Sequence, residues 1–415
     1  MWLPRPVGSR LRRSAGQRFL LKATIRCNIE LHYEKCNSVC VNVSTGTVRS
    51  YGQSRTVVCS ALPRRQLTMR ACVLEVFDGP VPVVDVADPT CPTDGVVVAV
   101  RACGVCRSDH HAWKGVDPDV VLPHVMGHEL AGEVVAVGAA CRSFSIGDRV
   151  TAPFILGCGT CADCRSGAAT VCRDQHVIGF SSWGAFAELV AIPRAEFNLV
   201  RLPDALGFVA AAGIGCRVTT AWRAVADRGR LQAGEWLVVH GAGGVGHAAL
   251  LLGRALGART IAVDINPGAL QFAIDAGVDE VIDASRVDDV AGAVHDISGG
   301  GAHVAIDGLG VQATFDNSLR SLRPLGRHVQ VGMPVGGDAV VPLALLDLVY
   351  ARQLTIMGMR GLDASGFGEL FDLVEAARFD PASLVTATIG LDGVEAVLRG
   401  MDGAQPPGIA VVEMS

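Results

Sequence analysis

Residues 236–246 read WLVVHGAGGVG: an apolar run closed by a histidine, followed by Gly241, Gly243, Gly244 and Gly246. The run predicts a buried strand, and the apolar pattern of residues 246–256 predicts a helix directly after the glycines. Glycines in this setting permit a tight turn and let the pyrophosphate of a dinucleotide approach the helix N-terminus. A GxGxxG motif alone is weak, but its place between a strand and a helix indicates a dinucleotide-binding turn.

The chain around this turn alternates between short apolar runs and helical patterns. The predicted strands are residues 236–239, 260–263, 280–282, 303–306, 328–331 and 354–357. Such alternation predicts a doubly wound α/β domain, with a parallel sheet covered by helices on both faces. Asp264 ends the second strand, 23 residues after Gly241, close to the ~20 expected for a carboxylate that binds ribose hydroxyls and repels a 2′-phosphate. Because Ile265 and Asn266 offer no arginine to such a phosphate, we expect NAD rather than NADP.

The preceding part of the chain has a different sequence pattern, with short predicted strands and no alternating helices. Its predicted strands are residues 71–77, 81–86, 96–100, 129–137 and 149–152, and turn residues separate them. This pattern is typical of an irregular β-rich domain. A last strand-like run, residues 409–412, is predicted to rejoin that domain after the α/β part ends.

Length and charge limit the class of protein. The 415 residues are half apolar and carry a net charge of −5, which predicts about two domains and argues against nucleic acid as a partner. No run of about 18 residues is free of polar interruptions. We therefore expect a cytoplasmic protein that acts on a small molecule, with no membrane and no nucleic-acid partner.

The first 68 residues differ from the rest of the chain in charge composition. They hold ten Arg and two Lys against Glu30 and Glu34, a net charge of +10, so the rest of the chain carries −15. We expect Met69 to be the true start, with residues 1–68 an upstream extension. A mitochondrial-type targeting segment and a disordered basic tail are the alternatives.

Four cysteines lie close together in a glycine-rich loop. The set is Cys158, Cys161, Cys164 and Cys172, spaced C-x2-C-x2-C-x7-C. Four thiolates at such spacings can form the tetrahedral shell of a structural zinc site. Disulfides fit a cytosolic enzyme poorly, and the x7 gap does not support an iron–sulfur cluster.

Three further signatures carry metal-ligand residues. They are CGVCRSDHH at 103–111, MGHELAG at 126–132 and GCRVTT at 215–220. Each is weak alone, since a lone buried Cys or His is usually an ordinary core residue. Together with the four-cysteine lobe and the dinucleotide turn, in this order along the chain, they resemble a zinc-dependent alcohol dehydrogenase of the medium-chain dehydrogenase/reductase superfamily.

The resemblance covers the chain from Met69 onward and implies its organisation. It implies a GroES-like catalytic domain at 69–216 with the structural zinc lobe at 157–173, a Rossmann-type NAD domain at 217–359, and a return to the catalytic domain at 360–415. It also implies two zinc ions per chain. The catalytic zinc would be held by Cys106, His128 and Cys216, a set that leaves one tetrahedral position open for the substrate oxygen.

The remaining roles follow from the same resemblance. Glu129 would lie behind the metal and Asp109 would orient His128, the alternative for both being an ordinary buried ion pair with an arginine. Ser108 and His111 would relay the proton, with His110 as the rival imidazole. The expected cofactor contacts are Arg107, Thr220, Gly241, Gly243, Gly244, Val245, Gly246 and Asp264.

One departure and three alternatives accompany this interpretation. Many family members carry a C-terminal Gly-Arg pair that reaches the cofactor, but residues 407–410 here read PGIA. A polyol or amino-alcohol dehydrogenase commonly has Glu as third ligand, so Cys216 favours the alcohol type. A zinc-free quinone reductase would lack Cys106 and His128, and a non-catalytic zinc- and nucleotide-binding redox sensor would not need Ser108. Family members assemble as dimers or tetramers, so we expect a homo-oligomer.

Overall fold

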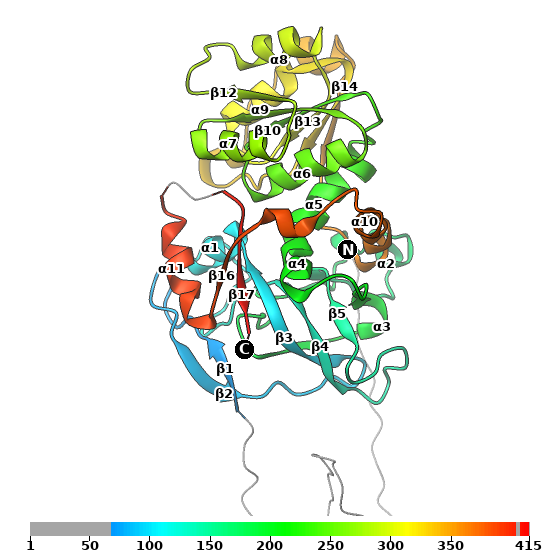
Figure 1. Cartoon of the computed structure of the whole chain (residues 1–415), viewed down its shortest axis with the longest axis vertical. Helices are drawn as coiled ribbons and strands as arrows, with labels where there is room; N and C mark the ends of the chain where they lie inside the picture. Colours follow the sequence, from blue (N-terminus) through cyan, green and yellow to red (C-terminus); the bar gives the residue numbers. More distant parts are fainter. Residues whose placement is uncertain (1–67, 404–406, 415) are drawn as a thin grey trace, which may run out of the picture. The chain divides into compact units, whose positions relative to one another are not determined.

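The computed structural model describes residues 68–403 and 407–414 (Figure 1). The predicted basic extension at 1–68 therefore lies outside the described residues, except for Thr68. Among the described residues, no helix combines the length and the apolar character that crossing a bilayer requires.

A six-stranded parallel sheet forms the core of the α/β part, in the order β12-β11-β10-β13-β14-β15. Its strands are β10 (Trp236–His240), β11 (Arg259–Asp264), β12 (Glu280–Asp283), β13 (Ala302–Asp307), β14 (Leu322–Gln330) and β15 (Thr355–Gly358). All five neighbouring pairs are parallel. The strand order reverses between β10 and β13, which is where open α/β sheets bind ligands at the carboxyl ends of their strands.

Helices cover both faces of this sheet (Figure 1). They are α6 (Gly244–Ala255), α7 (Pro267–Asp275), α8 (Val290–Ser298) and α9 (Gln312–Arg320). Leu237 and Val239 of β10 belong to the hydrophobic core that also holds buried residues of α6 and α7. Trp236 and Val238 point the other way, into the core shared with α8 and α9. The alternation buries both faces of the strand, and the predicted doubly wound fold is confirmed.

A second, mostly antiparallel sheet joins strands that precede the parallel sheet in the sequence with the last two strands, in the order β16-β17-β3-β4-β5-β9, with β8 paired to β3. Its strands are β3 (Val96–Val105), β4 (Glu129–Val137), β5 (Arg149–Thr151), β8 (Leu189–Ile192), β9 (Val200–Arg201), β16 (Val385–Ile389) and β17 (Ile409–Glu413). The C-terminal strand β17 pairs with β3, Ala410 opposite Val105. The end of the chain thus supports the strand that leads into Cys106.

The first predicted strand, residues 71–77, is wrong over most of its length. The observed strand β1 (Thr68–Cys72) pairs with β2 (Val83–Ala87) and stops where Leu74 turns to bridge His124. Asp78 then adopts a left-handed conformation, φ 57°, which reverses the chain. The apolar pattern continues past the point where the strand's pairing partner changes, and periodicity does not reveal such a change.

Shorter elements complete the described residues. Around the cysteine lobe lie β6 (Ile155–Leu156), α2 (Ala162–Arg165), η1 (Ala169–Val171), β7 (His176–Val177) and α3 (Ala195–Asn198). A continuous helical run links the sheets: α4 (Phe208–Gly213), η2 (Ile214–Val218), α5 (Thr219–Trp222) and η3 (Arg223–Arg228). Later elements are η4 (Gly336–Ala339), η5 (Leu345–Tyr350), η6 (Ala364–Gly366), α10 (Phe367–Glu375), η7 (Pro381–Leu384), η8 (Leu391–Gly393) and α11 (Val394–Gly400).

Candidate active site

Four potential metal ligands from three distant parts of the chain meet in the interior. Cys106 caps the N-terminus of α1 (Arg107–Trp113), His128 and Glu129 stand at the start of β4, and Cys216 lies in η2. One donor atom from each residue lies within 4.8 Å of the others. All four residues are buried, and we call them the buried cluster.

The chemistry of the buried cluster fits a metal ion. Nε2 of His128 is buried without a hydrogen-bond partner among the described residues, an arrangement that normally costs about 1–3 kcal/mol. A bound cation would satisfy that nitrogen. Two thiols and an imidazole are the donor set of catalytic zinc with one position left open.

The two thiols of the buried cluster influence each other's ionisation. The hydrogen bond between them lowers the pKa of Cys106 and raises that of Cys216. Burial raises the pKa of the Glu129 carboxyl group, against the opposing effect of a neighbouring arginine. The thiol pair thus favours ionisation of Cys106 over ionisation of Cys216.

Asp109 orients His128. Its Oδ1 accepts hydrogen bonds from Nδ1 of His128 at 2.9 Å and from the amide of Gly127 at 3.0 Å, and its Oδ2 accepts from the amide of Cys106 at 2.8 Å. One carboxylate thus fixes the ring and backbone of two cluster residues. The alternative, an ion pair with an arginine, does not occur for Asp109 among the described residues.

Glu129 forms the ion pair that Asp109 lacks. Its Oε1 accepts from Nε of Arg217 at 3.1 Å and its Oε2 from Nη2. Glycines make room for this carboxylate, since a Cβ at Gly104 or Gly215 would lie 2.1 or 2.4 Å from the Glu129 side chain. Glu129 is thus both a member of the buried cluster and half of a buried salt bridge. Sequence reasoning missed Arg217, although its place directly after Cys216 was a usable signal.

The η2 segment positions Cys216, and Thr220 follows in α5. The η2 segment is a π-helix with a non-helical residue inside, Gly215 at φ −5° and ψ −120°, and such segments are frequent at functional sites. One turn later the hydroxyl of Thr220 is buried and has no hydrogen-bond partner among the described residues. A bound ligand's amide or carbonyl would satisfy it.

The predicted relay residues lie on α1. The hydroxyl of Ser108 is 3.8 Å from Sγ of Cys106, at the edge of the buried cluster. His111 makes no side-chain hydrogen bond to the described residues, and burial, reinforced by His110 and Arg107, lowers its pKa below the usual 6.5. The rival His110 is instead held by Asp402, Nε2 to Oδ1 at 2.9 Å.

The glycine turn has the geometry that the motif predicts. Gly241 has φ 94°, and a Cβ at Gly246 would lie 2.0 Å from the carbonyl oxygen of Gly241. Asp264 ends β11 beside this turn, and its Oδ2 accepts from the amide of Ala242 at 2.7 Å. Helix α6 starts at Gly244, next to Val245, with no side chain capping its N-terminus. Its first amides are therefore open to an anion.

Arg107 is engaged away from this turn. Its Nη1 donates to the carbonyl of Met401 at 2.6 Å, which joins α1 to the end of α11. The predicted pyrophosphate contact would need another donor of this side chain.

The four lobe cysteines form a second, separate cluster. Their sulfurs lie within 4.8 Å of one another, with separations of 3.9 Å for Cys158–Cys164 and 3.8 Å for Cys161–Cys172. A tetrahedron with zinc–sulfur distances of ~2.3 Å has edges of about 3.8 Å, whereas a disulfide needs ~2.05 Å. The hydroxyl and amide of Thr160 and the amide of Cys161 donate to Cys158 and lower its pKa to about 5. The lobe fits a metal ion with no open position.

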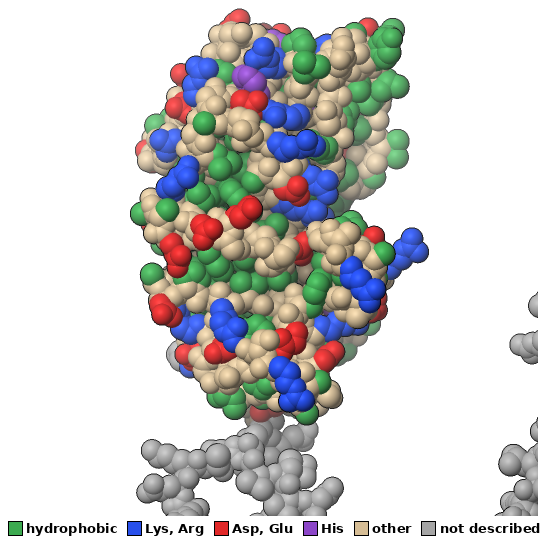
Figure 2. Space-filling model, turned by 90° about the vertical axis from the view of Figure 1, so that its right-hand side faces the viewer, with side chains coloured by type: hydrophobic (Ala, Val, Ile, Leu, Met, Phe, Trp, Pro, Cys, Tyr) green, Lys and Arg blue, Asp and Glu red, His purple; other side chains and the backbone are tan. Residues whose placement is uncertain are grey.

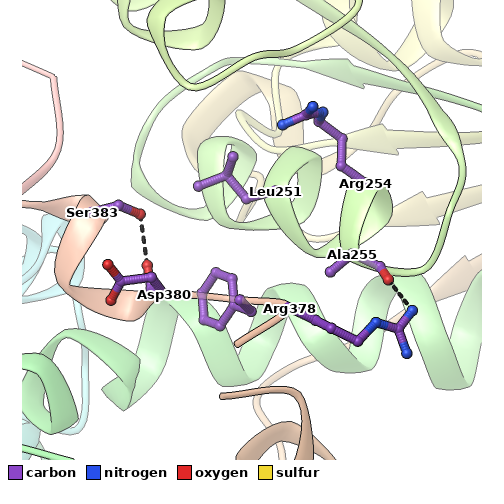
Figure 3. Close-up of a pocket in the computed structure, with 7 residues that line it drawn as sticks. Leu251, Arg254, Ala255, Arg378, Asp380 and Ser383 are labelled. Atoms are coloured by element: carbon purple, nitrogen blue, oxygen red, sulfur yellow. Dashed lines mark hydrogen bonds between the residues drawn. The ribbon is translucent and has the colours of Figure 1, made fainter. Parts of the chain in front are cut away.

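A surface depression of about 290 Å³ lies elsewhere, between the end of α6 and residues 378–383 (Figure 3). Arg378 crosses it to donate to the carbonyl of Ala255, and Ser383 donates to the carbonyl of Asp380. None of the predicted site residues lines it.

Comparisons with known proteins agree with this arrangement. Residues 92–204 match the alcohol dehydrogenase GroES-like domain and residues 244–376 match the zinc-binding dehydrogenase family. An alcohol dehydrogenase of Geobacillus stearothermophilus is 33% identical over 79% of this chain and 93% of its own length. Two solved structures each cover 84% of this chain and all of their own. One is an NAD-dependent alcohol dehydrogenase with 29% identity and a TM-score of 0.76. The other is a putative zinc-binding dehydrogenase of Sinorhizobium meliloti 1021 bound to NADP, with 28% identity and a TM-score of 0.75.

The two family models together cover most of the described chain, and the relatives match over nearly their full length. The chain therefore belongs to the zinc-dependent alcohol dehydrogenase family of the medium-chain dehydrogenase/reductase superfamily and is an oxidoreductase of that type.

Proposed function

We propose that this protein is a two-zinc, NAD-linked dehydrogenase that interconverts a primary or secondary alcohol with its aldehyde or ketone. The observation that carries the proposal is the buried cluster, where Nε2 of His128 lies next to two thiols and has no hydrogen-bond partner among the described residues. When bound, zinc would supply Lewis acidity there and NAD would accept a hydride. Cys106, His128 and Cys216 would hold the metal.

The chain's own residues supply positioning and proton transfer. Asp109 fixes the ring of His128, so the ligand nitrogen points into the cluster. Phe154 and Phe180 flank that ring, with centroids 5.7 and 5.2 Å away, and keep water from its sides. The hydroxyl of Ser108 would take the proton of the substrate alcohol, and a hydroxyl suits this role because it both donates and accepts. His111 would pass the proton to solvent.

The cofactor preference rests on Asp264. Its carboxylate stands at the carboxyl end of β11 beside the glycine turn, where it would bind ribose hydroxyls and repel a 2′-phosphate. Of the two solved relatives, one is NAD-dependent by name and the other binds NADP, so this choice varies among similar proteins and needs a direct test.

The test is a steady-state screen of short aliphatic, aromatic and polyol substrates with NAD and with NADP, together with elemental analysis. We expect turnover of simple alcohols with NAD and about two zinc ions per chain. Turnover restricted to polyols would support the polyol alternative. A folded, zinc-loaded protein without turnover on the whole panel would contradict the enzymatic proposal.

We also propose that the protein self-associates. Strand β15 is the edge of the parallel sheet, and large apolar side chains near it are well exposed: Leu325 69%, Leu345 60%, Leu346 68% and Tyr350 76%. Exposed apolar side chains and an open sheet edge favour pairing with a second copy. Light scattering would contradict self-association if it showed a monomer at micromolar concentration.

On the face in Figure 2, acidic and basic side chains lie among one another, unlike a nucleic-acid-binding surface.

A further inference from the structure

Arg217 is a buried arginine whose guanidinium group forms hydrogen bonds along one edge and none along the other edge to the described residues. It is 6% exposed. One edge is saturated, because Nε and Nη2 donate to Glu129 and Nη2 also donates to the carbonyl of Val105 at 2.8 Å. The other edge, Nη1, has no hydrogen-bond partner among the described residues. Arginine carries five N–H donors, so this side chain has capacity left for another acceptor.

The unused edge lies against the first residue of α6. A Cβ built on Gly244 would be 2.5 Å from Cδ of Arg217 and 3.4 Å from its Nη1. Helix α6 has 12 residues, and no side chain caps its N-terminus. Open helix amides and a free guanidinium edge at the same place both attract an anion.

The absence of a side chain at Gly244 is what allows the approach. A side chain there would occupy the space that the Arg217 methylenes fill. Arg107, the other arginine predicted near the cofactor, donates its Nη1 to the carbonyl of Met401 instead. The described C-terminal stretch, residues 407–414, contains no arginine. Arg217 is therefore better placed for a phosphate at this turn than Arg107 or residues 407–414.

We propose that Nη1 of Arg217 binds the dinucleotide pyrophosphate at the N-terminus of α6, while the opposite edge of the same guanidinium holds Glu129 in the buried cluster. The proposal rests on the proposed function, since it assumes that a dinucleotide occupies the glycine turn. A single side chain then ties the cofactor phosphates to the metal-side carboxylate. Arg217 thus acts as a binding residue for the cofactor. It affects the reaction only indirectly, by positioning the pyrophosphate and Glu129.

The test measures ligand binding by calorimetry on the zinc-loaded full chain, with ADP and adenosine as probes. Removing Arg217 alone would leave a buried carboxylate unpaired, so Glu129→Gln is the reference and Glu129→Gln with Arg217→Met is the test variant. We expect the double variant to bind ADP about 10–100-fold more weakly than the reference, the usual worth of a charged hydrogen bond. Adenosine affinity should not change, because adenosine carries no phosphate.

Arg223→Met is the matched control. Arg223 is equally buried in the same helical run, but its partners are Asp227, Thr170 and two carbonyls near residue 360. This variant should bind ADP like the unchanged protein. Equal weakening by Arg223→Met, or loss of adenosine binding together with ADP, would overturn the proposal by showing a general structural effect.

Arg217→Lys is a second test of phosphate binding by Arg217, for use if the double variant does not fold. Lysine keeps the charge beside Glu129 but has no second edge for a phosphate, so ADP affinity should again fall while adenosine affinity stays. Unchanged ADP affinity in a folded variant would overturn the role of Arg217 and leave the dehydrogenase proposal intact. Failure of the unchanged, folded protein to bind ADP or NAD would overturn both.

Discussion

The two cysteine clusters solve the same coordination problem in opposite ways. The lobe draws its four sulfurs from residues 158–172, and its own backbone amides donate to them at 3.2–3.4 Å. The buried cluster draws its donors from residues 106, 128, 129 and 216, which strands β3 and β4 of the antiparallel sheet and the segment η2 bring together. The lobe obtains all four sulfur ligands from one short segment. The buried cluster combines residues from distant segments, so it depends on other residues, such as Asp109, to orient its side chains.

Replacing one cysteine in each cluster should affect different properties: turnover for the buried cluster and thermal stability for the lobe. This is the largest effect that we expect. Cys106→Ser should remove one zinc and lower kcat/KM at least ~10⁴-fold, about 5 kcal/mol of lost Lewis-acid stabilisation. Cys161→Ser should also remove one zinc, but it should lower Tm by at least ~5 °C while the folded fraction keeps its turnover. Elemental analysis, thermal unfolding and kinetics measure the three quantities. If Cys106→Ser loses zinc and keeps its turnover, the buried cluster is not catalytic.

Ser108→Ala tests the open side of the buried cluster. The hydroxyl of Ser108 lies 3.8 Å from Sγ of Cys106, whereas the hydroxyl beside the lobe sulfurs, that of Thr160, donates to Cys158 at 3.4 Å. Loss of the Ser108 hydroxyl should lower kcat by ~10²–10⁴-fold, the usual range for a proton-transfer group, with zinc content and the Kd of NAD unchanged. Ser108→Thr keeps the hydroxyl and is the matched control. A Ser108→Ala enzyme with nearly full kcat and bound zinc would assign the proton to another path.

Sequence alone predicted the parts that are local. The lobe, the glycine turn and most strands were readable because spacing and periodicity carry them, and β4 has the predicted bounds of 129 to 137. Cys106, His128 and Cys216 were proposed as ligands through family resemblance, since nothing in their spacing shows that they meet. Their meeting depends on β3 running to Val105 and on the π-helical η2, and neither has a sequence period.

The partners that sequence reasoning could not supply are those set by contacts across the fold. Arg217 reads as one more residue of a helix until Glu129, Val105 and Gly244 are seen around it. Likewise, His110 and His111 are equivalent in sequence, and only the contact of His110 with Asp402 separates them. Long-range pairing of polar side chains is information that a pattern of apolar residues does not contain.

Asp109→Asn asks how much the assembled cluster depends on its supporting carboxylate. Asp109 accepts from His128, Gly127 and Cys106, and an amide can satisfy only part of this set. Loss of such a partner typically costs 10–100-fold in metal affinity. Competition with a chelator should show this loss for one zinc only, while the lobe zinc dissociates at its original rate. Equal loosening of both zinc ions would indicate a general loss of structure.

Asp264→Ser extends the comparison to the glycine turn, which like the lobe is contiguous in sequence. Removing the carboxylate should shift the NAD to NADP ratio of kcat/KM toward NADP by ~10–30-fold, about 1.5–2 kcal/mol for one charged hydrogen bond. Asp279→Asn is the control, because this carboxylate accepts from the amide and hydroxyl of Thr260 near the amino end of β11, whereas Asp264 stands at the carboxyl end. An unchanged ratio would mean that Asp264 serves only the amides of Ala242 and Asn266.

His111→Gln should have the smallest effect, because water can replace an imidazole at the solvent end of a relay. We expect a loss of less than ~10-fold at neutral pH. Burial lowers the pKa of His111, so the ring stays neutral and able to accept a proton down to below pH 6.5, and activity should fall only as the pH drops through that lowered pKa. The substitution should remove this acid limb of the pH–rate profile. His110→Gln should retain it, since Asp402 already engages that ring. If the limb disappears with His110→Gln and persists with His111→Gln, the relay runs through the other imidazole.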